Sequence, residues 1–240
     1  MRSNHDIELI KSRISDPVCI ENFLSGEDIS HLINIFNQHQ AGGIKAYEGL
    51  VEKITGPVTL NLEPYLDDPV IVKIMHNLEK EIGKFEMTAG FFFRTDFPHI
   101  IHNDDTHELP ATVYKGITLP LELNGFKEEY PKLCFFDQFY FHGPAKFFKG
   151  SKDIPTYYNK QIYNYEHVDG LTNNQFVGEF SYFTHLYPQW LEGLSFHSAL
   201  DWIPGNALIF DSTRLHCASD FRSLEIKSKL AISIFTKVVV

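Results

Sequence analysis

The hydrophobic pattern of this chain changes its period at Gly83. Before this glycine, apolar residues recur every three to four positions, as in amphipathic helices; after it, short runs rich in Phe, Ile, Val, Thr and Tyr are separated by Gly, Pro, Asn and Asp. These runs are EMTAGFFFRT, TVYKGITLPLEL, KLCFFDQFYF, NALIFD and KLAISIFTKVVV. Several short strands without helices between them predict an antiparallel sandwich or barrel, and not a βαβ fold.

Two helices are predicted in the first third of the chain. In FLSGEDISHLINIFNQHQ, Ser25 and Asp28 have the spacing of a capping box, and an apolar stripe follows until the AGG tripeptide. In DDPVIVKIMHNLEKEIG, Asp68 can cap the helix, Pro69 suits the first helical position and Gly83 ends it. The helical segments therefore precede the strand-rich part of the chain.

Composition narrows the class of partner. The net charge of −10 and the pI of about 5.6 argue against nucleic acid or an anionic membrane as the main partner. The sequence has no apolar run of about 18 residues and no apolar core of a signal peptide near its start, so we expect a cytoplasmic protein. Three scattered cysteines predict reduced thiols and no disulfide framework.

The polar stretch RTDFPHIIHNDDTHELP contains a candidate metal site. His102 and Asp104 are separated by one residue, so on an extended segment both side chains point to the same side and can bind one ion. His-x-Asp also arises by chance, so a third ligand is needed. His99 and His107 are interpreted as surface or supporting residues, and Asp105 as a solvated neighbour or the alternative carboxylate.

The third ligand is predicted in DWIPGNALIFDSTRLHCASDF, where His216 follows a strand and a short polar turn. Farther along, Lys229 begins the strand KLAISIFT. The alternation of a strand places Lys229 on a face of mostly small residues that points into a cavity, where a cation is costly unless it meets an anion. That face is Lys229, Ala231, Ser233 and Phe235, and the opposite face is Leu230, Ile232 and Ile234.

The order of helices, strand, His102-x-Asp104, further strands, PGNALIFDSTRLH with His216, and a basic residue at the start of an apolar strand resembles the iron(II)- and 2-oxoglutarate-dependent dioxygenases. The resemblance covers roughly residues 85–240. It implies a mainly β, α+β chain with a double-stranded β-helix (jelly-roll) core buttressed by N-terminal helices. One domain, 1–240, would then comprise a helical part, 1–84, and an oxygenase core, 85–240. A Tyr-rich insertion at about 143–200 is the candidate substrate lid and contains Tyr157, Tyr158, Tyr163, Tyr165 and Trp190.

The resemblance implies that His102, Asp104 and His216 hold Fe(II) as a 2-His-1-carboxylate triad. Such a triad leaves three positions open for a bidentate 2-oxo acid and O2. Halogenating relatives replace the carboxylate with a small residue, so Asp104 implies oxygenation. Ascorbate is expected only as an auxiliary reductant.

The residue that binds the distal carboxylate of 2-oxoglutarate has two candidates. Lys229 is preferred because of its place at the start of the last strand, and Lys115 with Thr118 is the alternative, by resemblance to related folds that carry the lysine on an earlier strand. Arg94 and Arg214 flank the two ligand segments and are candidates for binding an anionic group.

The expected activity is hydroxylation of a small metabolite or a peptidyl residue, with release of succinate and CO2. Two alternatives remain open. One is a cupin-type metalloenzyme that does not use 2-oxoglutarate, and the other is a non-catalytic jelly-roll module that binds a peptide or sugar. The expected partners are a small molecule or a protein substrate, without nucleic acid or membrane; the sequence does not indicate an oligomeric state.

Overall fold

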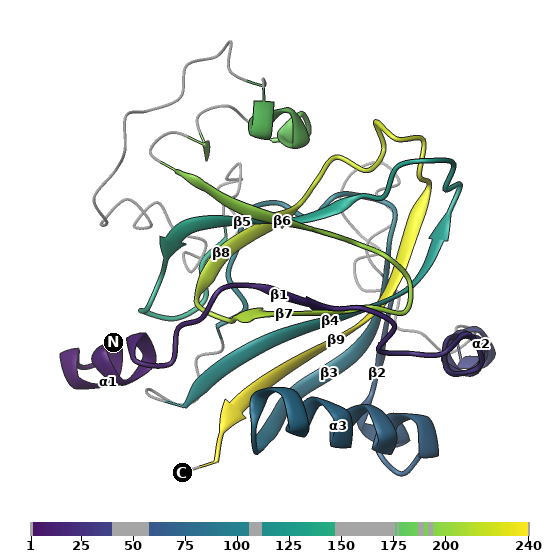
Figure 1. Cartoon of the computed structure of the whole chain (residues 1–240), viewed down its shortest axis with the longest axis horizontal. Helices are drawn as coiled ribbons and strands as arrows, with labels where there is room; N and C mark the ends of the chain where they lie inside the picture. The colour runs from purple at the N-terminus through teal and green to yellow at the C-terminus, as the bar shows by residue number, and fades with distance from the viewer. Residues whose placement is uncertain are drawn as a thin grey trace, which may run out of the picture.

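Two antiparallel β-sheets face each other in the computed structural model of the chain, which describes residues 2–39, 58–105, 112–146, 176, 178–186, 190–191 and 194–239 (Figure 1). The larger sheet has the order β1-β7-β4-β9-β3-β2, and the smaller sheet has the order β6-β5-β8. The strands are β1 (Val18–Ile20), β2 (Val58–Asn61), β3 (Phe85–Thr95), β4 (Val113–Asn124), β5 (Lys132–Phe139), β6 (Phe196–Asp201), β7 (Ala207–Asp211), β8 (Arg214–Ala218) and β9 (Ser228–Val238). This arrangement is a jelly roll, as predicted.

The α-helices of the described part are α1 (Asn4–Lys11), α2 (Gly26–His39) and α3 (Pro69–Ile82). The two predicted helices are confirmed, with their caps. The backbone N–H of Ser25 donates to Asp28 Oδ2 at 2.9 Å, and the N–H of Asp28 donates to Ser25 Oγ at 3.1 Å. Asp68 caps α3 by accepting from the N–H of Val70 at 2.9 Å. Helix α1, which begins with a second capping box, was not predicted. No helix in the described ranges is long and apolar enough to cross a membrane.

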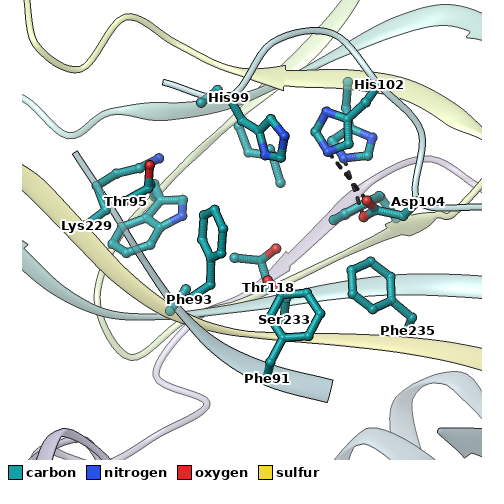
Figure 2. A pocket seen from close by; sticks show the side chains of 16 residues that line it. Phe91, Phe93, Thr95, His99, His102, Asp104, Thr118, Lys229, Ser233 and Phe235 are labelled. Atoms are coloured by element: carbon teal, nitrogen blue, oxygen red, sulfur yellow. Dashed lines mark ion pairs between the residues drawn. The ribbon is translucent and has the colours of Figure 1, made fainter. Parts of the chain in front are cut away.

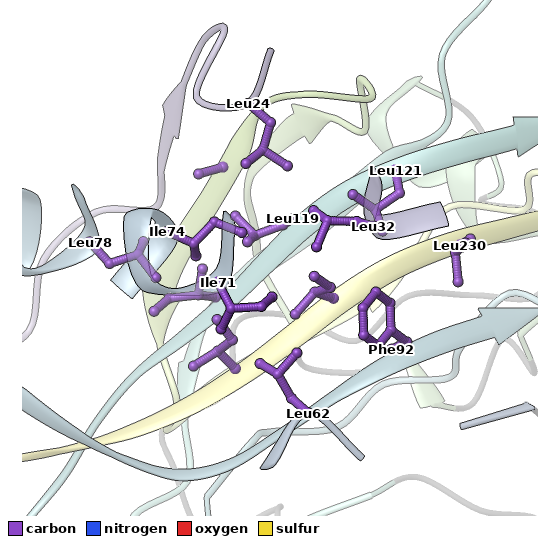
Figure 3. Packing of buried hydrophobic residues seen from close by; sticks show 14 of the residues in the cluster. Leu24, Leu32, Leu62, Ile71, Ile74, Leu78, Phe92, Leu119, Leu121 and Leu230 are labelled. Atoms are coloured by element: carbon purple, nitrogen blue, oxygen red, sulfur yellow. The ribbon is translucent and has the colours of Figure 1, made fainter. Parts of the chain in front are cut away.

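The main hydrophobic core lies between helices α2 and α3 and the outer face of the larger sheet (Figure 3). Helix residues such as Leu32 and Ile71 pack here with Phe92 of β3 and Leu230 of β9, all of them at most 1% exposed. Full burial of one such side chain contributes about 1.5–3 kcal/mol. The helices therefore cover one face of the larger sheet, and the opposite face is left to line a pocket.

The alternation predicted for β9 is confirmed. Leu230, Ile232 and Ile234 belong to the helix-facing core, whereas Lys229 and Phe235 line a pocket between the two sheets, together with Ala231 and Ser233. Strand β9 lies between β3 and β4 in the larger sheet. The face of β9 that carries Lys229 and Phe235 therefore lies in the middle of the larger sheet's side of the pocket.

Four strands were not recognised in the sequence: β1, β2, β6 and β8. The region predicted as helical also contains β1 and β2, which extend the larger sheet at its two edges by pairing with β7 and β3. Strand β6 lies within the range assigned to the insertion, so any insertion ends before Phe196. These four strands are three to six residues long, and unlike NALIFD at β7 they contain no continuous apolar run of about four or more residues bounded by turn residues that would mark them.

Candidate metal centre

The side chains of His102 and His216 come together because their backbones pair. The N–H of His102 donates to His216 O at 3.0 Å, and the N–H of His216 donates to His102 O at 2.9 Å. Directly opposed residues of an antiparallel pair point to the same side, and the two ring centroids lie 4.3 Å apart. His216 is part of β8, whereas His102 pairs with it as an isolated bridge.

Asp104 completes the cluster (Figure 2). Its N–H donates to Ser212 O at 2.8 Å, which anchors the loop beside the end of β7. Its carboxylate faces both imidazoles, with 3.4 Å from Oδ1 to His102 Nε2 and 3.5 Å from Oδ2 to His216 Nε2. One ligand atom from each of the three residues lies within 4.8 Å of the others, so a single ion fits between them.

Backbone carbonyls orient both imidazoles. His102 Nδ1 lies 2.7 Å from Ile100 O, and His216 Nδ1 lies 3.0 Å from Arg214 O. Because a carbonyl can only accept, each Nδ1 carries the proton and each Nε2 keeps its lone pair for a metal. Both Nε2 atoms face Asp104.

Burial and charge keep this donor set ready for a metal. Burial lowers the pKa of His102, and the adjacent His216 lowers it further. Burial raises the pKa of Asp104, but the two imidazoles that face it lower it more, so its pKa lies below the usual range of a carboxyl. Two nitrogen donors and one carboxylate on one side of an ion are the donor set typical of non-heme Fe(II) oxygenases.

The loop that carries His102 and Asp104 is fixed by the residue on each side of Asp104, namely Asn103 and Asp105. The amide of Asn103 donates to Tyr140 O and Gly143 O, each at 3.1 Å, and Asn103 Oδ1 accepts from the N–H of Ala145 at 2.6 Å. Because Asn103 is 5% exposed, water competes little for these hydrogen bonds. They fix the backbone that carries His102 and Asp104.

Asp105 lies with Arg2 and away from the two imidazoles. Arg2 donates from both terminal nitrogens to the Asp105 carboxylate, with 2.7 Å from Nη2 to Oδ1, and from Nη1 to Phe141 O at 3.0 Å. The side chains are 6% and 0% exposed. The structure thus places Asp104, and not Asp105, beside the histidines. A contact between residues 103 positions apart leaves no local signal in the sequence.

Asp105→Asn is expected to weaken metal binding about 10-fold, the lower end of the range for outer-shell changes at metal sites, because Asp105 adjoins the ligand Asp104 and fixes its loop through Arg2. The change leaves Arg2 buried without its counter-ion and loosens the loop at Asp104. Titration with Co(II), followed by its visible absorption, measures the affinity. Glu8→Gln, which removes an exposed ion pair with Lys11 in α1, is the matched control and should change nothing. Equal affinities in wild type and Asp105→Asn would contradict this role.

Gly116 of β4 packs directly against the cluster. A Cβ at this position would lie 2.7 Å from the Phe210 ring, closer than real Cβ contacts, and 3.0 Å from Asp104 Oδ2, closer than nine in ten of them. The absence of a side chain therefore lets Asp104 approach the sheet. No pattern in the sequence distinguishes this glycine from one in a weakened strand.

Gly116→Ala is expected to destabilise the protein by about 1–3 kcal/mol, the cost of overpacking, and to weaken metal binding by displacing Asp104. Urea unfolding and the Co(II) titration measure the two effects. The matched control is Gly26→Ala, where a Cβ would meet nothing within 4 Å. A Gly116→Ala protein as stable and as metal-competent as Gly26→Ala would show that the contact is unimportant.

The pocket extends from the three metal-site residues to Lys229, which is 6% exposed. Its ammonium lies 4.8 Å from the centroids of both the Trp202 and Phe221 rings, and within the described part of the chain it has no hydrogen-bond or ion-pair partner. Burial lowers its pKa to about 7. The hydroxyl-bearing residues Thr95, Thr118 and Ser233 line the same pocket.

Lys115 does not line this pocket. Its ammonium lies 2.5 Å from Asp211 Oδ1 and 2.8 Å from Ser15 Oγ, on the other side of β4 from Thr118. Of the alternative pair, the structure brings only Thr118 to the pocket. Lys115 is occupied by a buried ion pair and is not available to an anion between the sheets.

The two arginine candidates also lie outside the pocket lining. Arg94 pairs with Glu122 at 3.2 Å. The guanidinium of Arg214 lies 4.3 Å from the Phe139 ring centroid and donates to Phe136 O at 3.1 Å.

His99, by contrast, lines the pocket and stacks on His102 with ring centroids 4.2 Å apart. Burial lowers its pKa well below the usual range. It therefore forms part of the pocket wall next to His102. His107 and the predicted lid tyrosines Tyr157, Tyr158, Tyr163 and Tyr165 lie outside the described residues. Trp190 is described and packs in a second hydrophobic cluster behind the smaller sheet.

Comparison with known proteins identifies the fold. No protein-family model matches the sequence, and no curated protein matches it. Among solved structures, the carbocyclase SnoK, a non-heme alpha ketoglutarate dependent enzyme from nogalamycin biosynthesis, matches with a TM-score of 0.53 and 11% identity, over 98% of this chain and 84% of SnoK. The epimerase SnoN, of the same description and biosynthesis, matches with a TM-score of 0.51 and 12% identity, over 97% of this chain and 83% of SnoN.

This chain therefore has the jelly-roll fold found in the non-heme, 2-oxoglutarate-dependent enzymes. The predicted fold class is confirmed.

Proposed function

We propose that this protein is an Fe(II)- and 2-oxoglutarate-dependent oxygenase in which His102, Asp104 and His216 hold the metal and Lys229 binds the co-substrate. One observation carries the proposal. A two-histidine, one-carboxylate donor set and a buried lysine that has no counter-ion among the described residues line the same pocket of a jelly roll. Each is costly to bury, and each is stabilised by one of the two proposed ligands.

Lys229 would select a dicarboxylate. Taking about 4 Å and an effective dielectric of about 20, its attraction for the distal carboxylate is about 4 kcal/mol before desolvation is subtracted. The rings of Trp202 and Phe221 exclude water from this contact and so strengthen it. Thr118 and Ser233 pair with each other across β4 and β9 and line the pocket between Lys229 and Phe235, where their hydroxyls would face the diacid.

When bound, iron would supply activation of O2 coupled to decarboxylation of 2-oxoglutarate. The overall reaction is 2-oxoglutarate plus O2 plus R–H giving succinate, CO2 and R–OH, so one oxygen atom enters succinate and the other the product. The chain's own task is to fix the three ligands, orient the diacid and hold the C–H bond near the metal. Hydroxylation of a small molecule or a peptidyl residue is the proposed outcome. The single domain of residues 1–240 and a cytoplasmic location also stay proposals.

The test is succinate formation by purified protein stripped of metal and then given Fe(II), 2-oxoglutarate, ascorbate and air. We expect slow uncoupled turnover that depends on both Fe(II) and 2-oxoglutarate and disappears in Asp104→Ala. A protein that binds metal but neither binds nor consumes 2-oxoglutarate would favour a cupin-type metalloenzyme. A protein that binds neither would favour a binding module, and either result would refute the proposal.

A further inference from the structure

The pocket has two distinct ends along β9. Lys229 and Phe235 both line it and are six positions apart on the same strand, a separation of about 20 Å along β9. Phe235 pairs with Gly116, which packs against Asp104, so Phe235 lies at the level of the metal-site residues. A five-carbon diacid that runs from Lys229 to the metal would end beside Phe235, so this ring lies at the metal end of the pocket.

That end is aromatic. Phe235 of β9 and Phe91 of β3 have ring centroids 5.5 Å apart, and Phe93 continues the row at 6.4 Å from Phe91 (Figure 2). All three are only partly buried, whereas Phe92, on the other face of β3, is 0% exposed. Apolar rings left partly open to a pocket gain free energy when an apolar group covers them.

Apart from Asp104, no charged side chain of the described residues lines this end of the pocket. The partly buried Lys146 acts electrostatically on His99, His102 and Asp104 but is not part of the lining. Among the described residues that line the pocket, the charged side chains are Asp104 and Lys229. In the proposed function, the metal takes Asp104 and the distal carboxylate takes Lys229. A charged substrate group placed against Phe91 and Phe235 would lose hydration, and no charged side chain of the described lining would be left to replace it.

We propose that the substrate presents an uncharged hydrocarbon ring to the row formed by Phe91, Phe93 and Phe235. The C–H bond that is oxidised then belongs to a carbon of that ring or to a carbon bonded to it. This inference rests on the proposed function, because it assigns Lys229 and Asp104 to other ligands. A neutral ring stacks offset or edge-to-face on phenyl groups, which adds about 0.5–1.5 kcal/mol per pair to the burial of its surface. Free amino acids and other zwitterions of similar size are disfavoured at this end.

The experiment uses the full chain loaded with Zn(II), which is diamagnetic and redox-inert, and saturated with 2-oxoglutarate. Three probes share the naphthalene ring system and differ in charge: 2-naphthylmethanol, 2-naphthoate and 2-naphthylmethylammonium. Ligand-observed NMR titration gives their dissociation constants. We expect the neutral probe to bind at least about 10-fold more tightly than either charged probe, a difference of about 1.4 kcal/mol.

Variants of Phe235 test whether the neutral probe binds at the aromatic row. Phe235→Ala should weaken the neutral probe at least about 10-fold and leave 2-oxoglutarate affinity unchanged; Phe235→Leu, which keeps most of the volume, should retain the fold and lose less. Phe97→Ala is the matched control, since Phe97 is 41% exposed and outside the pocket lining. Equal or tighter binding of a charged probe, or no effect of either Phe235 variant, would overturn the inference while 2-oxoglutarate still binds. Failure of 2-oxoglutarate to bind the wild type would refute the proposed function itself.

Discussion

His216→Ala is expected to lower metal affinity by more than about 100-fold and to abolish turnover of 2-oxoglutarate. The loss should exceed the roughly 10-fold to 100-fold that is usual when a residue that only supports a metal ligand is removed. The variant removes one of three donors and leaves Asp104 facing His102 alone. Metal affinity by Co(II) titration and succinate formation by chromatography measure the two effects.

His197→Ala is the matched control for this change. His197 is in β6 of the same sheet, pairs with Asp137 at 2.8 Å and does not line the pocket. It should bind metal as the wild type does. Circular dichroism distinguishes loss of a ligand from loss of fold, since His216 is 2% exposed and its removal leaves a cavity. A folded His216→Ala protein with wild-type metal affinity would exclude His216 as a ligand.

Lys229→Met is expected to raise the KM for 2-oxoglutarate by about 100-fold or more while metal affinity stays unchanged. Methionine keeps the length and apolar stem of lysine but removes the charge, so about 4 kcal/mol of attraction, less the desolvation that a cation pays, is lost. Steady-state succinate formation over a range of 2-oxoglutarate concentrations gives the KM.

Lys115→Met separates the two lysines that the sequence left as alternatives. This change leaves Asp211 buried without its partner, so we expect a loss of about 3–5 kcal/mol in the free energy of unfolding and an unchanged KM in the folded fraction. If Lys115→Met raised the KM and Lys229→Met did not, the assignment would have to be reversed.

The parts of the fold that alternation and capping determine were predictable from the sequence. The two faces of β9 followed from a strict period of two, and the start of α3 followed from Asp68 and Pro69. The grouping of His102, Asp104 and His216 was implied by the family resemblance that the order of their motifs carries, and the structure brings these side chains together.

Other features depend on contacts that have no local pattern. Strand β8 is five residues long and holds His216 by pairing with β5 and with the backbone of His102, which no property of RLHCA reveals. Arg2, which contacts Asp105, lies 103 positions earlier in the sequence. Gly116 matters only because Phe210 and Asp104 meet at its Cα, and the aromatic row depends on the register of β3 with β9.

The most direct test of the central claim is an anaerobic titration of the Fe(II)-loaded protein with 2-oxoglutarate, followed by visible absorption. A 2-oxo acid that chelates Fe(II) produces a metal-to-ligand charge-transfer band. We predict a saturable band with one equivalent of 2-oxoglutarate in the wild type, a weakened affinity in Lys229→Met and no band in His216→Ala. A wild-type protein that binds Fe(II) but develops no band at saturating 2-oxoglutarate would contradict the account.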